Sequence, residues 1–296
     1  MSHFSVLVIG ENPKEQLEPF QENNMDDCPS KYLEFKDQTE EFKEEYENKD
    51  TEMLKLADGT LKYTWDSNKL TEDEKKTATK IKIKHKDRYK TFDEFCKGWH
   101  SAEKDEKKGV YGYWHNPNSK WDWYSIGGRW SGSLKLKDGA TGTAGEGSTF
   151  TRCDPKLEKE RLERLETHTD QARIKDIDFS PDMDEYNKAK RFWELYVEGE
   201  KVKTKADKDL IDFVMYKKEY YTKRYKNKEE YAKLQSEFST FAVLKDGVWH
   251  EKGEMGWFGC SSATPEEESK WDKSYFDTFL KDLPPETLIT VVDCHI

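Results

Sequence analysis

The two ends of the chain carry near-continuous apolar runs, and these constrain the fold more than any other feature. Residues 3–10 form a stretch rich in Val, Leu and Ile that closes at Gly10, which predicts a strand. Residues 287–295 contain the run Leu288-Ile289-Thr290-Val291-Val292, which is typical of a strand buried on both faces. We predict that these two terminal strands lie in one sheet.

Further signals flank the two runs. A helix is predicted over 13–20, and the capping-box pattern Thr264-Pro265-Glu266-Glu267 predicts the start of another that ends before Pro284-Pro285. Asp246-Gly247 lies between apolar stretches and predicts a hairpin. The resulting order predicts an α+β fold: a ferredoxin-like split βαβ sandwich core formed by both chain ends, interrupted by a large helix-rich insertion.

This order divides the chain into three predicted parts. Residues 1–24 and 239–296 form the terminal α+β core. Residues 25–150 form a mixed insertion that includes an aromatic hairpin block. Residues 151–238 form a helical arm, because apolar residues recur there at helical spacing.

The charge balance limits the choice of partners. The formal net charge is −11, so general attraction to nucleic acid or anionic lipid is not expected. An acidic protein favours a basic surface, such as the groove in which another protein holds DNA. The basic stretches 80–90 and 217–228 leave a nucleic-acid-binding protein as an alternative.

Composition bears on assembly and location. Aromatic residues make up 14% of a chain that is 38% charged, which suggests small aromatic cores and a homo-oligomer that buries what a monomer leaves exposed. No apolar window approaches the length of a membrane span, so a cytoplasmic protein is expected.

No pattern for a metal, a cofactor or a catalytic nucleophile is evident. The five cysteines are widely separated and form no C-x-x-C pair, so reduced thiols are expected. Gly10-Glu11-Asn12-Pro13 lacks the further glycines of a dinucleotide-binding loop. We therefore expect a binding protein without a cofactor or a metal, and not an enzyme.

The segment 111–130 is an unusual passage in which aromatic rings alternate with turn residues. Trp, Tyr and Arg dominate protein contact surfaces and stacking platforms. The same pattern also fits a small aromatic core around a hairpin, with Trp121 and Trp123 on one face. The candidate partner-contact residues are Trp114, His115, Trp121, Trp123, Tyr124, Arg129 and Trp130.

An alternative catalytic group lies at the chain ends. Asp293 and His295 share one face of the last predicted strand and Cys294 points to the other, because strand side chains alternate. His3 lies on the strand expected nearby. His3, Asp293 and His295 are thus the candidates for a small metal-dependent or hydrolytic enzyme.

Three segments together carry a family resemblance: residues 1–10, the block Tyr111–Trp130 and the end Thr290–Ile296. They resemble a phage-encoded anti-defence family that includes the Gabija anti-defence protein of Bacillus phages. The resemblance implies a homo-oligomer in the host cytoplasm that binds a bacterial defence nuclease complex, the Gabija nuclease subunit GajA with its helicase subunit GajB, and keeps DNA out. It implies no catalytic residues.

Overall fold

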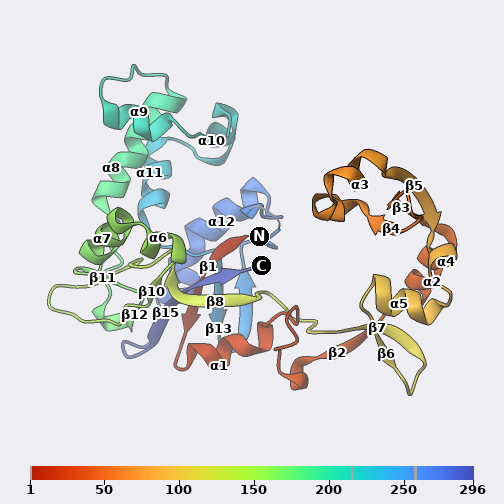
Figure 1. Ribbon diagram of the computed structural model, residues 1–296. Helices are drawn as coiled ribbons and strands as arrows, with labels where there is room; N and C mark the ends of the chain where they lie inside the picture. Colours follow the sequence, from red (N-terminus) through yellow and green to blue (C-terminus); the bar gives the residue numbers. More distant parts are fainter. Residues whose placement is uncertain (1, 215, 257–258) are drawn as a thin grey trace. The chain divides into compact units, whose positions relative to one another are not determined.

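The computed structural model describes residues 2–214, 216–256 and 259–296 (Figure 1). The chain divides into two compact units. We call Met1–Asn24 with Asn118–Ile296 the sheet unit, and Met25–Pro117 the inserted unit. The α+β class is confirmed. Among the described residues no helix is long and apolar enough to cross a membrane.

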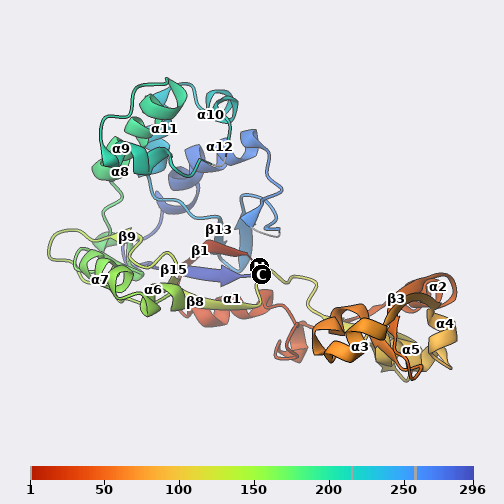
Figure 2. The same cartoon turned by 45° about the horizontal axis from the view of Figure 1, so that its top comes forward.

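The two chain ends pair in the middle of the main sheet. Strand β1 (His3–Ile9) runs antiparallel to β15 (Leu288–His295), from the pair His3–His295 to the pair Ile9–Ile289. Both strands are buried along most of their length, as their continuous apolar character requires. The prediction that the terminal strands share one sheet is confirmed, and Figures 1 and 2 show the two ends side by side.

The rest of the sheet differs from a split βαβ arrangement. Its order is β10-β8-β15-β1-β13-β14, and β12 also pairs with β15. The bounds are β8 (Trp123–Gly128), β10 (Glu146–Gly147), β12 (Gln171–Arg173), β13 (Ala242–Lys245) and β14 (Val248–Glu251).

A split βαβ unit would place an antiparallel strand between β1 and β13, whereas these two are direct parallel neighbours. The ferredoxin-like core is therefore not confirmed. The physical reason lies in the predicted hairpin, which forms with Asp246 and Gly247 at positive φ. Its apolar strand β13 is buried and takes the inner position, while the more exposed β14 takes the edge.

Each face of the sheet has its own helix layer. Helix α12 (Pro265–Tyr275), which continues as the π-helical η7 (Phe276–Leu280), packs on the face that carries Leu7 and Val291. Helix α1 (Pro13–Leu17) and the 3-10 turn η1 (Glu18–Phe20) pack on the face of Val6 and Val292. The capping box at Thr264 is present as predicted.

The boundary of the insertion differs from the one expected at residue 150. Residues 118–150 contain β8, which pairs with β15 through Val292–His295 and so belongs to the sheet unit. Strand β7 (Val110–His115) pairs instead with β2 (Glu34–Asp37) and β6 (Glu103–Asp105) of the inserted unit. The expected aromatic hairpin therefore does not form, because the two halves of the block join different sheets.

Helices dominate residues 149–238, as predicted. They are α6 (Thr149–Cys153), α7 (Pro155–Arg164), α8 (Met183–Phe192), the π-helical η5 (Trp193–Val197), α9 (Lys205–Ile211), α10 (Lys218–Arg224) and α11 (Lys228–Ser236). Short elements precede α8: β9 (Leu134–Lys135), β11 (His168–Thr169) and the 3-10 turn η4 (Ile174–Asp176). Helices α8 to α11 lie together beside α12 (Figures 1 and 2) around buried Trp193, Tyr221 and Tyr225.

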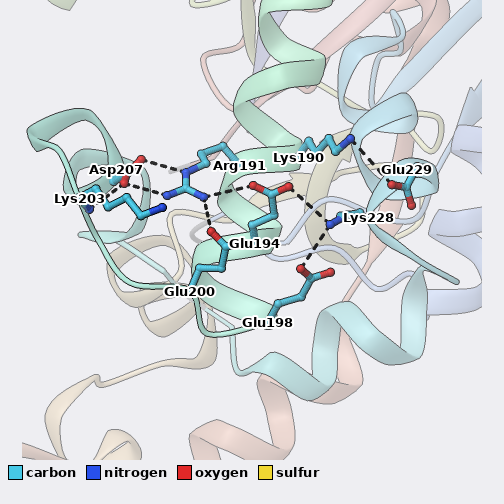
Figure 3. A network of polar contacts seen from close by, with 9 residues as sticks. All are labelled: Lys190, Arg191, Glu194, Glu198, Glu200, Lys203, Asp207, Lys228 and Glu229. Carbon is cyan, nitrogen blue, oxygen red and sulfur yellow. Dashed lines mark hydrogen bonds and ion pairs between the residues drawn. The ribbon is translucent and has the colours of Figure 1, made fainter.

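A network of ion pairs and hydrogen bonds connects several of these helices (Figure 3). The Arg191 guanidinium donates to both carboxylate oxygens of Asp207, at 3.0 and 2.9 Å, and also reaches Glu194 and Glu200. Lys228 of α11 lies 3.5 Å from the same Glu194. The Arg191 hydrogen bonds hold the pKa of Asp207 well below its usual range. Arg191 thus links α8, η5 and α9 through one planar group.

The inserted unit contains two small sheets, ordered β2-β7-β6 and β4-β3-β5. Its elements are the 3-10 turns η2 (Ser30–Tyr32) and η3 (Thr64–Lys69), the helices α2 (Thr39–Asn48), α3 (Glu72–Thr77), α4 (His85–Arg88) and α5 (Phe92–Trp99), and the strands β2 (Glu34–Asp37), β3 (Asp50–Lys55), β4 (Leu61–Tyr63), β5 (Thr79–Lys84) and β6 (Glu103–Asp105). Phe42, Phe95 and Tyr111 form the centre of its aromatic core.

The buried His85 and the half-buried His100 face one glutamate in this unit. His85 Nε2 and His100 Nε2 lie 3.7 and 3.8 Å from the two carboxylate oxygens of Glu45. Burial lowers the pKa of both imidazoles, although the Glu45 charge acts in the opposite direction. Both rings pack on aromatic neighbours, and His100 stacks on Phe42 with a centroid distance of 4.0 Å. They are therefore expected to be neutral in the folded chain at neutral pH.

The inserted unit is expected to lose stability as the pH falls below the ordinary histidine pKa of 6.5. The unfolded chain binds protons there, whereas the folded His85 and His100 bind them only at lower pH, so protonation favours unfolding. Urea unfolding between about pH 7.5 and 5.5 measures the effect. The double variant His85→Phe, His100→Phe is expected to lose most of this pH dependence, and an unchanged dependence in that variant would contradict the assignment.

Candidate functional site

The structure brings the three candidate catalytic residues together on the α12 face of the sheet. His3 Nδ1 lies 2.8 Å from Asp293 Oδ1. Only 1% of the Asp293 side chain and 12% of the His3 side chain are exposed. The second carboxylate oxygen, Oδ2, accepts the backbone N–H of Arg129 at 2.9 Å. A carboxylate can only accept, so His3 Nδ1 donates a proton to Asp293, and Nε2 is the ring nitrogen that this pair leaves unused.

A second imidazole–carboxylate pair lies beside the first. His295 Nδ1 is 2.6 Å from Asp122 Oδ1, and the two histidine rings meet edge to face with centroids 4.9 Å apart. Trp123 stacks on His295 at 4.9 Å and 19°, and its edge contacts His3. Within the described part of the chain, neither histidine Nε2 has a hydrogen-bond partner. The pairs therefore fix the tautomer and orientation of both rings.

Cys294 takes no part in this group. It lies on the opposite face of the sheet, in the core beside Phe4 and Trp121. Burial, followed by the charges of Asp293 and Asp122, raises the pKa of its thiol well above the usual value. The expectation that Cys294 turns away from Asp293 and His295 is confirmed, and a Cys–His nucleophile is excluded here.

A tight turn after β8 shapes the site. Gly127 and Gly128 both have positive φ, of 75° and 53°. A Cβ on Gly128 would lie 2.3 Å from Asp293 Cβ, and one on Gly127 would lie 2.5 Å from Asp170 Oδ2. Glycine is required because two buried aspartates press against the turn. The turn in this way delivers the Arg129 N–H to Asp293.

His3, Asp293 and Arg129 line a cleft of about 260 Å³. Its other walls come from β8, β10 and the start of α6, with Ser125, Glu146 and Phe150 among the lining residues. Arg152, also in the lining, pairs with Glu146 at 3.2 Å. Among the described residues the Arg129 guanidinium has no ion pair or hydrogen bond of its own.

The seven candidate partner-contact residues are divided between the two units. Trp114 and His115 belong to the inserted unit, and the other five belong to the sheet unit. Trp121 is buried in the core, where its ring N–H donates to Leu17 O. Tyr124 and Trp130 pack against the two core clusters.

Trp123 and Arg129 are exposed, and both line the cleft. The expected shared face of Trp121 and Trp123 is wrong, because Trp121 precedes β8 and the strand alternation begins only at Trp123.

Two residues of the site are not among the candidate site residues chosen from the sequence. Asp122 pairs with His295, and the fully buried Asp170 accepts from Ser131 Oγ, Gly132 N and Gly145 N. Both depend on the pairing of β8 and β12 with β15, which no local pattern predicts. The one available signal is the pair of adjacent glycines, since a Gly-Gly turn between apolar segments indicates close packing from a neighbour.

Some of the cations in the two basic stretches are paired with carboxylates. Lys80 and Lys86 pair with Glu52 and Glu47. Lys80, Lys82 and Lys84 alternate along the exposed side of β5, an edge strand, where charge hinders edge-to-edge aggregation. In the second stretch Lys228 pairs with Glu194 and Glu198. Within the described residues no group of three or more His, Cys, Asp or Glu is arranged to hold a metal ion.

Comparisons with protein-family models, with curated proteins and with solved structures find no match for this chain.

Proposed function

We propose that this protein is a phage anti-defence protein that binds a bacterial defence nuclease complex of the Gabija type and blocks the access of DNA. It acts in the host cytoplasm as a homo-oligomer and as a binding protein, without catalysis. The sequence resemblance of its two ends and of residues 111–130 suggests this partner. The observation that carries the binding role is an exposed aromatic group on the inserted unit.

This aromatic patch consists of Tyr63, Trp65, Trp99 and Arg88. Trp65 is 60% exposed and stacks on Tyr63 with a centroid distance of 4.1 Å and an angle of 11°. Trp99 lies 6.0 Å away, and the Arg88 guanidinium lies over the Tyr63 ring at 4.3 Å. Stacking holds the rings in place before a partner arrives, which lowers the entropic cost of binding.

The composition of the patch is that of an interface hot spot. Trp, Tyr and Arg are the residues whose truncation costs most at protein interfaces. A stacked Trp that remains exposed in the free chain can still bury its outer face against a partner. The patch lies on a unit whose helix α2 presents the exposed carboxylates Glu40, Glu41, Glu44 and Glu47.

The acidic balance supports the choice of partner. A nuclease holds DNA on a basic surface, and a chain with net charge −11 is attracted to that surface at long range. Binding there excludes DNA by occupying its position. The attraction weakens with added salt, as it does for exposed charges in general.

Purified protein is expected to co-purify with the Gabija complex and to stop its DNA cleavage. Trp65→Ala should weaken this binding by roughly 2 kcal/mol, about thirtyfold in Kd, and restore cleavage. Leu162→Ala, which removes a 53% exposed apolar side chain from the sheet unit, is the matched control and should inhibit as the wild type does.

Two results would contradict the proposal. A wild-type chain that neither binds the complex nor slows cleavage rules out the function. A Trp65→Ala variant that is folded and fully inhibitory rules out the aromatic patch as the contact.

A further inference from the structure

We propose that the cleft beside His3 and Asp293 binds a free nucleoside monophosphate, with the phosphate at Arg129 and His3 and the base against Trp123. The cleft belongs to the sheet unit and the aromatic patch to the inserted unit, and the proposal does not depend on the nuclease contact. It rests on three features of the cleft: its charge balance, its exposed rings and its size.

Carboxylates in the cleft are already paired within the protein, so the positive charge of Arg129 remains available to an anionic ligand. Asp293 is occupied by His3 and by the Arg129 N–H, and Glu146 is paired with Arg152. Among the described residues of the cleft, the Arg129 guanidinium is a cation without a carboxylate partner. A guanidinium binds phosphate oxygens through two parallel N–H donors.

His3 adds a second phosphate contact. Its Nδ1 is held by Asp293, so Nε2 is the ring atom left for a ligand. A phosphate oxygen that reaches this ring therefore contacts Nε2, while Asp293 holds the ring through Nδ1. The ring is held in position by Trp123 and His295, which contact it edge to face at 5.1 and 4.9 Å. The phosphate end of the site is therefore pre-formed.

The cleft also offers exposed aromatic rings for a base. Trp123 is 46% exposed although one of its faces stacks on His295. Its remaining exposure leaves ring surface for a second stacking partner. Phe150, which also lines the cleft, is 76% exposed. Stacking on such rings stabilises any nucleobase, because every base has a π-face.

Size and charge favour a mononucleotide over a strand. A volume of about 260 Å³ lies near the lower end of ligand pockets. A polynucleotide needs several cations along its path, and the chain carries a net charge of −11. The Arg129 guanidinium and the His3 imidazole provide enough contacts for a single phosphate group.

Calorimetric titration with AMP tests the site. Saturable binding of one AMP per chain is expected, and Arg129→Ala, His3→Gln and Trp123→Leu should each weaken it by at least about tenfold. Trp114→Leu removes a comparably exposed ring, 42% against 46%, from the inserted unit and should leave the affinity unchanged. Adenosine, which lacks the phosphate, should bind at least about tenfold more weakly than AMP.

The opposite results overturn the proposal. The absence of AMP binding at millimolar concentration would do so, as would equal affinities for the wild type and for folded Arg129→Ala and Trp123→Leu variants. An oligonucleotide that binds more tightly than AMP and is equally sensitive to Arg129→Ala would assign the cleft to a strand instead.

Discussion

A Gly128→Ala variant is expected to lose roughly 3–5 kcal/mol of the free energy of unfolding of the sheet unit. The new Cβ would lie 2.3 Å from Asp293 Cβ, 2.4 Å from Asp293 Oδ2 and 2.6 Å from Ser125 Oγ, which are all closer than van der Waals contact. Two of these atoms belong to the central strand β15, whose backbone pairs on both sides and cannot shift freely. The positive φ of 53° adds its own strain.

Gly139→Ala is the matched control for this change. Gly139 also has a positive φ, of 77°, but a Cβ there would meet nothing within 4 Å. Its variant should lose only the backbone term, about 1–2 kcal/mol. Denaturant unfolding of the two variants separates the cost of the positive φ from the cost of the steric clash. Equal losses in the free energy of unfolding would show that Asp293 and Ser125 do not press on Gly128.

An Asp170→Ala variant is expected to lose a similar amount, roughly 3–5 kcal/mol. Asp170 is fully buried and accepts from Gly132 N at 2.6 Å, Gly145 N at 2.8 Å and Ser131 Oγ at 3.0 Å. Removal of the carboxylate leaves the buried Gly132 N–H and the half-buried Gly145 N–H without an acceptor. For a unit of this size the melting temperature should fall by roughly 10 °C.

Asp277→Ala serves as the control for Asp170. The Asp277 side chain is 69% exposed and pairs with Lys281 one helical turn away. Such a pair contributes less than about 0.5 kcal/mol, so the melting temperature should hardly change. If the Asp170→Ala and Asp277→Ala variants have the same melting temperature, the Asp170 carboxylate does not stabilise the loops 127–132 and 142–147.

Local patterns in the sequence predicted the elements whose signals are local. The terminal strands, the Asp246-Gly247 hairpin and the capping box at Thr264 are all present, because turn and cap geometry depend on neighbouring residues. The apolar character of β1 and β15 predicted that they share one sheet, and the structure shows that they pair directly. This pairing places His3 opposite His295 and diagonal to Asp293.

Long-range pairing was the part that could not be predicted. Strand β8 carries Trp123 and Gly128, and nothing in its sequence distinguishes β15 from β7 as a partner. Once β8 joins β15, Asp122 reaches His295 and Trp123 covers it. The positions of Asp122 and Trp123 in the site therefore depend on the register of β8 against β15. The predicted order of β13 and β14 in the sheet was also wrong. The more apolar of the two, β13, takes the position beside β1, and the hairpin signal alone does not show which strand that is.

Within the predicted helical arm, the part that follows Asp207 is divided into separate helices. Asn227 caps α11 by accepting the backbone N–H of Glu230, so α10 and α11 are separate helices. The apolar spacing on both sides is helical, and only the cap marks the break.

The place where the chain leaves and re-enters the sheet unit has a consequence for how the protein can vary. Glu22 N donates to Trp121 O, and Lys120 N donates to Phe20 O, both at 2.7 Å. The outgoing segment before Asn24 and the returning segment after Asn118 are therefore joined by backbone hydrogen bonds. A loop whose ends are already joined adds little closure entropy when its length changes. We therefore expect that the inserted unit can be exchanged or shortened while the sheet unit keeps its fold.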